Sequence, residues 1–260
     1  MGKAQYLAIT GALLLFGVLY WGFSTIPPAS VKAEQAAETT GQGQDIEFSR
    51  IVLAAKSALS PEQSSGIEAS EKSLENTADE KNRIELLKGL SAQWFDVGQL
   101  PAAAGYAEQV AELEKTDSAW SVAGALFFNS LSGAHDAALR DYCAQHAVSA
   151  FEKAAALNPG RPEHQVNLAL VYAENPPADN PMKAVLLLRD LEKQYPDNPS
   201  VYNALGRLAI KTGQWDRAIE RLEKAMSLDP QNPNTPCLLA RAYQGAGQEA
   251  KAAEYAKRCK

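Results

Sequence analysis

A chain of 260 residues with 46% hydrophobic and 22% charged residues has the composition of a folded protein, of one large domain or two modest ones. Its 25 basic and 31 acidic residues give a net charge of −6, which argues against a duplex nucleic-acid binder, since such proteins need a basic face. Three cysteines are too few for a disulfide-dense mini-domain or a four-ligand zinc site.

The N-terminal segment is almost free of charge, because Lys3 is the single charged residue among the first 31. Residues 6–23 form its densest apolar part, and as a helix they would be roughly 27 Å long, close to the hydrocarbon thickness of a bilayer. Aromatic residues lie at both ends of this segment, at Tyr6, Tyr20 and Trp21, where membrane proteins place them at the headgroup boundary. The pattern predicts a transmembrane helix over residues 6–23.

The charges around this segment favour one orientation. Lys3 precedes the apolar segment, and acidic residues follow it, which predicts a short cytoplasmic N-terminus at residues 1–5 and the rest of the chain outside the cytoplasm. Residues 24–45 are polar and rich in Ala, Gln, Thr and Gly, so we expect a flexible linker. Two alternatives stay open: a signal peptide cleaved near Ala33, and a buried helix of a soluble domain.

From residue 46 onward the sequence is helical in pattern, with turns marked by Gly, Pro and Asn and no alternating strand pattern. Residues 46–83 are predicted to form an N-terminal helical hairpin. Its second helix begins at Pro61, with Ser60 as N-cap and Gln63 completing a capping box.

A pattern of small and large residues then repeats along the chain, most clearly over residues 199–232. The residues that carry it are Tyr202, Leu205, Gly206, Ala209, Gly213, Ala218, Leu222, Ala225 and Pro230. This pattern resembles the tetratricopeptide repeat (TPR), a helix–turn–helix unit of about 34 residues. Small residues let the two helices approach closely, and large ones fill the space between them.

The same pattern predicts about five TPR units within residues 84–260. Their ranges are 84–116, 117–161, 162–198, 199–232 and 233–260. The second unit is stretched between its helices, and the third has extra residues in its turn at 175–181, where Asn180 and Pro181 are expected to begin the next helix. The resemblance implies an all-α, TPR-type α-solenoid of antiparallel helix pairs behind a single N-terminal transmembrane helix.

Catalytic signatures are nearly absent from the sequence. It contains no phosphate-binding loop, zinc-protease motif, nucleophile elbow or Cys-x-x-Cys pair. Cys143 and His146 are spaced for shared metal ligation, but no further ligand is evident near them, and His135 and His164 add none. We therefore expect no enzyme activity, no cofactor and no metal, with a thiol or metal role for Cys143 and His146 as an alternative.

The other two cysteines belong to the last predicted unit. Cys237 and Cys259 lie on either side of its turn, about ten residues before and about twelve after it, which places both at the open end of one hairpin. An oxidising compartment would allow a disulfide that closes this terminal unit. The alternative is that both are small residues buried where the helices pack.

TPR arrays usually bind ligands on the concave face formed by the first helix of each unit. By this resemblance the candidate partner-binding residues are Asn167, Asn203, Arg207, Lys211 and Arg241. Arg207 and Arg241 occupy equivalent positions in neighbouring units, so they would form a basic strip suited to an acidic or C-terminal segment. Solvated surface charges are the alternative, and the proline-rich loop at residues 175–181 is a second candidate contact.

The whole arrangement of anchor, linker and solenoid resembles the membrane-attached TPR proteins of Gram-negative bacteria, in particular those of Bacteroidota. The resemblance implies a scaffold in the inner membrane with periplasmic repeats and protein partners. The alternatives are an assembly or chaperone-like factor for an envelope complex, and a regulatory subunit of a membrane enzyme. The sequence specifies neither the partner nor the oligomeric state.

Overall fold

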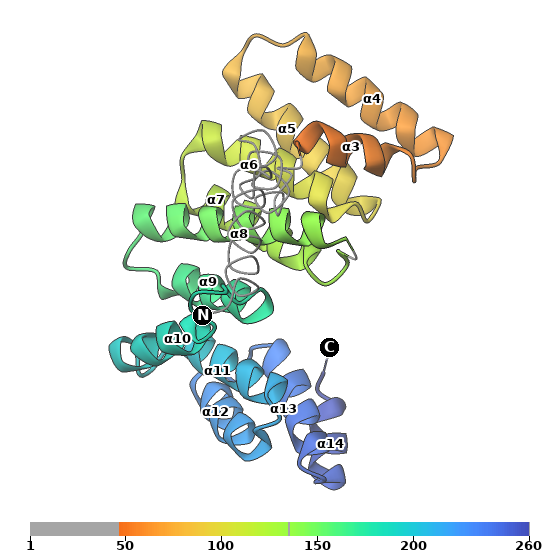
Figure 1. The fold of residues 1–260 in the computed structure, drawn as a ribbon. Coiled ribbons are helices and arrows are strands. Elements are labelled where there is room, and N and C mark those ends of the chain that lie inside the picture. The colour runs from red at the N-terminus through yellow and green to blue at the C-terminus, as the bar shows by residue number, and fades with distance from the viewer. Residues whose placement is uncertain (1–46, 135, 260) are drawn as a thin grey trace, which may run out of the picture. The chain divides into compact units, whose positions relative to one another are not determined.

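The computed structural model describes residues 47–134 and 136–259, and within these ranges it contains twelve helices and no strand (Figure 1). The helices are α3 (Phe48–Lys56), α4 (Pro61–Glu75), α5 (Glu80–Asp96), α6 (Leu100–Glu114), α7 (Asp117–Ser130), α8 (Ala137–Leu157), α9 (Pro162–Glu174), α10 (Lys183–Gln194), α11 (Pro199–Lys211), α12 (Trp215–Leu228), α13 (Asn234–Gly245) and α14 (Glu249–Ala256). The predicted all-α solenoid is confirmed.

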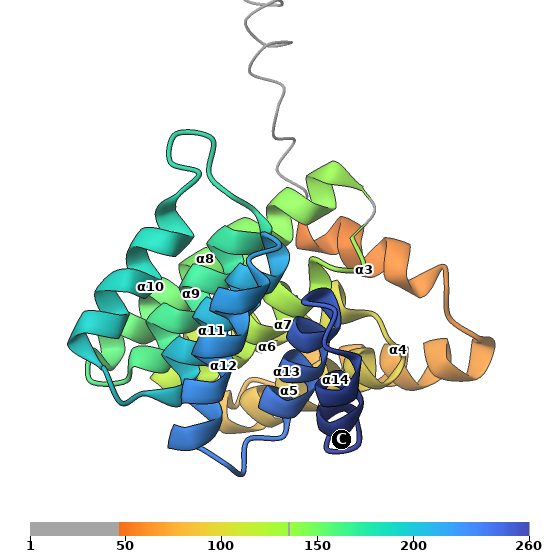
Figure 2. The same cartoon turned by 90° about the horizontal axis from the view of Figure 1, so that it is seen from below.

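From α5 onward, consecutive helices form pairs, and each pair packs against the next. The buried side chains therefore form a series of clusters along the stack, from one around Trp94 at one end to one around Tyr243 at the other. Such a core has no single centre, as expected when repeats contact only their neighbours. Figure 2 shows the stack from below, with the loop between α9 and α10 extending beyond the helices.

Turn and cap residues explain where these helices begin and end. The Ser60 side chain accepts a hydrogen bond from the Gln63 backbone, and the Gln63 side chain accepts one from the Ser60 backbone, which confirms the predicted capping box. Gly213 and Gly247 follow α11 and α13 with φ of 69° and 73°, a conformation that strongly favours glycine. Equivalent turns thus recur between the two helices of the last two pairs.

Helix α6 is built largely of small residues, which lets other helices approach it closely. Ala102, Ala103 and Ala104 are fully buried, and Gly105 is so close to α3 that a β-carbon there would lie 2.0 Å from Phe48 Cε2. The helices α3, α5 and α7 all pack on α6. Because of its small residues, α6 is the helix on which the other helices of the N-terminal end pack.

The two helices of the predicted 46–83 hairpin pack against different helices of the stack. Helix α3 packs on α6, while α4 packs on α5. An ion pair between Lys56 and Glu71 links α3 to α4, and Tyr106 of α6 donates a hydrogen bond of 3.0 Å to Glu71. Because α3 and α4 bury their apolar residues on other helices, they act as separate covers for the first repeat pair.

A polar cluster joins the second pair to the third. The carboxylate of Asp117, at the start of α7, lies 3.0 Å from Nε2 of the buried His164 and accepts a hydrogen bond of 3.1 Å from Asn158. The hydrogen bond from His164, followed by that from Asn158, holds the pKa of Asp117 below its usual value. This cluster ties the start of α7 to the end of α8 and the start of α9.

The loop after α9 differs from the prediction in one respect. Helix α10 begins at Lys183 with Met182 as N-cap, so the expectation that Asn180 and Pro181 begin the helix is wrong. Two successive turns displace the start, because the Asn180 N–H donates to Pro177 O and the Lys183 N–H donates to Asn180 O, each at 3.1 Å.

The predicted transmembrane helix at residues 6–23 and the linker at 24–45 lie outside the described residues. Among the helices of residues 47–134 and 136–259, none combines the length and apolarity needed to cross a membrane.

Candidate partner-binding surface

The first helices of the pairs, α5, α7, α9, α11 and α13, form what we call the first-helix face. Three of the five predicted partner-binding residues lie together on it, at a pocket of about 450 Å³ between α9, α11 and α13: Arg207, Lys211 and Arg241. Arg207 and Lys211 are one turn apart on α11, and Arg241 comes from α13. We call this hollow the arginine pocket.

The three cations of the arginine pocket are not equivalent. Lys211 forms an ion pair of 2.8 Å with Glu174 and donates to the Ala173 carbonyl at 2.6 Å, so its charge is already matched. Arg207 and Arg241 are exposed, and neither guanidinium group has an ion-pair or hydrogen-bond partner among the residues that the structure describes. Two guanidinium groups are thus available to a ligand, and their planar donor arrays suit a carboxylate.

The remaining walls of the arginine pocket are largely apolar. Besides Glu174, they are formed by Leu170, Ala173, Leu208, Ile210, Trp215 and Leu238. The Trp215 ring is held against the C-terminal end of α13, where a β-carbon on Gly245 would lie 2.4 Å from the ring. An apolar hollow with two unpaired cations is suited to an apolar side chain next to a negative charge.

Asn203 and Asn167 do not line the arginine pocket. The Asn203 side chain accepts a hydrogen bond of 3.0 Å from the fully buried Thr235, so it joins α11 to α13 within the fold. Asn167 is half-buried on α9. Sequence reasoning also missed Glu174, at the end of α9, and Trp215, at the start of the second helix α12.

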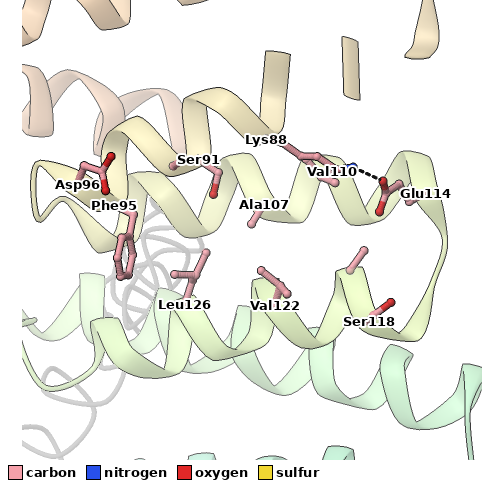
Figure 3. Close-up of a pocket in the computed structure, with 12 residues that line it drawn as sticks. Lys88, Ser91, Phe95, Asp96, Ala107, Val110, Glu114, Ser118, Val122 and Leu126 are labelled. Atoms are coloured by element: carbon pink, nitrogen blue, oxygen red, sulfur yellow. Dashed lines mark ion pairs between the residues drawn. The ribbon is translucent and has the colours of Figure 1, made fainter. Parts of the chain in front are cut away.

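A second hollow on the same face has different chemistry. It has a volume of about 420 Å³ and lies between α5 and α7, with α6 as its floor (Figure 3). Phe95, Val122 and Leu126 point into it, and the floor carries Ala107 and Val110. We call it the α5–α7 groove; nothing in the repeat pattern predicts it. A third apolar hollow of about 400 Å³ lies between α3, α6 and α8.

Known proteins share this helical architecture. Residues 209–258 match the family model described as tetratricopeptide repeat. A tetratricopeptide repeat protein from Parabacteroides merdae is 14% identical, with 81% of this chain and 78% of that one covered and a TM-score of 0.51. A thermophilic TPR protein from Thermus thermophilus is 22% identical, with 70% and 91% covered and a TM-score of 0.50.

The fold is a TPR-like helical solenoid. A curated relative, the cellulose synthase operon protein C of Pseudomonas fluorescens, is 36% identical over 87 residues, which are 34% of this chain. The chain spans only 7% of the length of that relative. The comparisons thus show the repeat fold, and they leave the membrane-anchored Bacteroidota type as a proposal.

Within the last TPR pair the structure contains a disulfide between Cys237 and Cys259, with their Cα atoms 4.7 Å apart. Cys237 lies in the first turn of α13, while Cys259 lies just beyond α14 rather than in it. The bond closes the open end of this pair, where no further repeat covers the helical stack within the described residues.

Cys143 and His146 form no metal site together. Cys143 is fully buried, and burial raises the pKa of its thiol to about 12. His146 Nδ1 lies 2.8 Å from Glu108 on α6. Among the described residues, no group of three or more His, Cys, Asp and Glu side chains is placed to hold a metal ion. The alternative metal role therefore has no geometric support; His135 lies outside the described residues.

Proposed function

We propose that this chain is a TPR scaffold, without catalytic activity of its own, that holds a protein partner on its first-helix face. The observation that carries the proposal is the arginine pocket, where the one carboxylate, Glu174, pairs with Lys211, and Arg207 and Arg241 have no ion-pair partner among the described residues. A pocket of this kind favours an acidic segment or a C-terminal carboxylate next to an apolar side chain. TPR folds are generally used for protein binding, which supports the proposal.

Recognition by these two arginines is tested in the native membrane. Crosslinking and mass spectrometry on intact membranes would identify the proteins bound to the wild-type chain and to the Arg207→Glu/Arg241→Glu variant. We expect the main partner to be lost from the variant. The matched control is Arg189→Glu/Lys257→Glu, which makes the same change in net charge at exposed residues of α10 and the end of α14. Equal partner recovery from both variants would reject the arginine pocket.

We further propose that residues 6–23 tether the scaffold to the inner membrane and that the repeats lie on the periplasmic side. The charge-free apolar segment and the position of Lys3 support this orientation. A reporter of compartment fused after Lys260 tests it directly. Activity of a reporter that functions only in the cytoplasm would contradict the proposed side.

A further inference from the structure

The α5–α7 groove lies where two neighbouring first helices of the array make the least contact with one another. Along the rest of the first-helix face, α7 contacts α9, α9 contacts α11 and α11 contacts α13, but α5 contacts α7 less than any of these helices contact each other, and both pack closely on α6. The buried α6 residues Ala107 and Val110 form the floor between them. The groove is therefore a local feature of this end of the stack.

Two helix faces form the sides of the groove. From α5 it receives Ser91 and Phe95, four residues apart, and from α7 it receives Val122 and Leu126, also four apart, so each side is one continuous helix face. Phe95 is 52% exposed and Val122 is 55% exposed, although both point into the hollow (Figure 3). These side chains would lose contact with water if an apolar segment occupied the groove, which is the main source of affinity at such sites.

The charges around the groove are predominantly negative. Lys88 is shared by two carboxylates, Glu114 at 2.8 Å and Glu85 at 3.2 Å. At the other end Asp96 lines the groove, and no cation pairs with it among the described residues. Among the charged side chains that line the groove, one cation thus stands with two carboxylates, Glu114 and Asp96, which is the opposite balance to that of the arginine pocket. A basic ligand complements this rim, whereas an acidic one is repelled by it.

We infer that the α5–α7 groove is a second docking site, which takes an amphipathic helical segment of a protein partner. Apolar residues of that segment pack on Phe95, Val122 and Leu126, and a lysine or arginine residue beside them pairs with Asp96. The inference rests on the proposed function only in taking the partner to be a protein. The first-helix face would then carry two sites of opposite charge. The α5–α7 groove would take a basic amphipathic segment and the arginine pocket an acidic segment, so together they select a partner that has both.

Photocrosslinking to the full-length chain in detergent tests this inference. Two synthetic amphipathic peptides carry the same apolar residues and one benzophenone group among them, and they differ only in having lysine or glutamate on the polar face. Mass spectrometry then locates the crosslinks. We expect saturable crosslinks from the lysine peptide to residues of α5 and α7, and weak crosslinks from the glutamate peptide.

Three variants make the test specific to the groove. Phe95→Ala/Val122→Ser should weaken binding of the lysine peptide by about tenfold, and Asp96→Lys should weaken the lysine peptide but not the glutamate peptide. Leu53→Ala/Leu157→Ala changes two leucines that are 70% and 51% exposed elsewhere, and it should leave binding unchanged. The four apolar side chains are at least half exposed and Asp96 is exposed, so the fold should tolerate their replacement.

Any one of three results would overturn the inference. Absence of saturable crosslinks in the groove, equal binding of both peptides, or retained binding by Phe95→Ala/Val122→Ser would each reject it. Crosslinks from the groove to another copy of the chain, without any peptide, would replace it with self-association. The Arg207→Glu/Arg241→Glu variant should still bind the lysine peptide, so a failure of the arginine pocket is distinguishable from a failure of this groove.

Discussion

Leu222 lies against Gly206 so closely that a β-carbon on residue 206 would come within 2.5 Å of Leu222 Cγ. Gly206 belongs to α11 and Leu222 to α12, so this contact sets the distance between the two helices of the pair. The second pair has the same relationship, since a β-carbon on Gly124 would lie 2.9 Å from Phe151 Cε1. A glycine facing a large apolar residue is thus a recurring element of this fold.

Replacing Gly206 with alanine should destabilise the protein. The added methyl group forces Leu222 or the α11–α12 backbone to move, which we expect to lower the free energy of unfolding by about 1–3 kcal/mol. Denaturant unfolding followed by circular dichroism measures the change. Gly89→Ala is the control, because Gly89 is exposed in α5 with no atom within 4 Å of a β-carbon. It should be stabilising by roughly 0.5–1 kcal/mol, and equal effects of the two substitutions would contradict the packing described.

The sequence pattern was sufficient to predict the repeat architecture, because its signals are local and periodic. Gly206 and Leu222 have counterparts at equivalent helix positions in other units, and Ser60 with Gln63 forms a cap within a single turn. Equivalent positions in neighbouring units also indicated that Arg207 and Arg241 share one surface. The pocket that they line agrees with that expectation.

The remaining features depend on contacts between distant segments, which periodicity does not encode. The pairing of Lys211 with Glu174 leaves only two of the three predicted cations available, and the bond from Thr235 holds Asn203 within the fold. The groove between α5 and α7 lies over α6, on which both helices pack. None of these contacts could be predicted from the repeat pattern of the sequence.

The Cys237–Cys259 disulfide should stabilise the last TPR pair. Its two cysteines are 22 residues apart, and closing a loop of this length contributes about 3 kcal/mol by restricting the unfolded chain. We expect Cys237→Ser/Cys259→Ser to lower the unfolding midpoint of the oxidised protein by a corresponding amount. Wild type in reductant should behave like this variant, and a wild type insensitive to reductant would contradict the prediction.

Cys143 should be inert toward alkylating agents in the native protein. Its thiol is fully buried with a pKa raised by burial to about 12, and the reactive form of cysteine is the thiolate. Maleimide labelling at pH 8 with mass spectrometry should therefore detect no adduct on the native oxidised chain, one after unfolding, and three after unfolding with reduction. Rapid labelling of native Cys143 would show that α8 opens readily.

Asp117 should make stability depend on pH in the acid range. Because the hydrogen bond from His164 lowers the pKa of Asp117 in the folded state, its contribution is complete above the unfolded value of about 3.9 and is lost as pH falls through the folded value. Thermal unfolding of wild type and Asp117→Asn tests this. The difference between their midpoints should be largest near pH 6 and shrink below pH 4. A constant difference would show that the charge of Asp117 is not responsible.

The most direct test of the proposed binding role is a fluorescence anisotropy titration of the full-length chain with a short labelled peptide, rich in glutamate and ending in a free leucine carboxylate. We expect saturable binding to wild type that weakens as salt is raised. Binding should be at least about tenfold weaker for Arg207→Glu/Arg241→Glu and unchanged for Arg189→Glu/Lys257→Glu. Equal binding by all three proteins, or no binding by wild type, would contradict recognition through the arginine pocket.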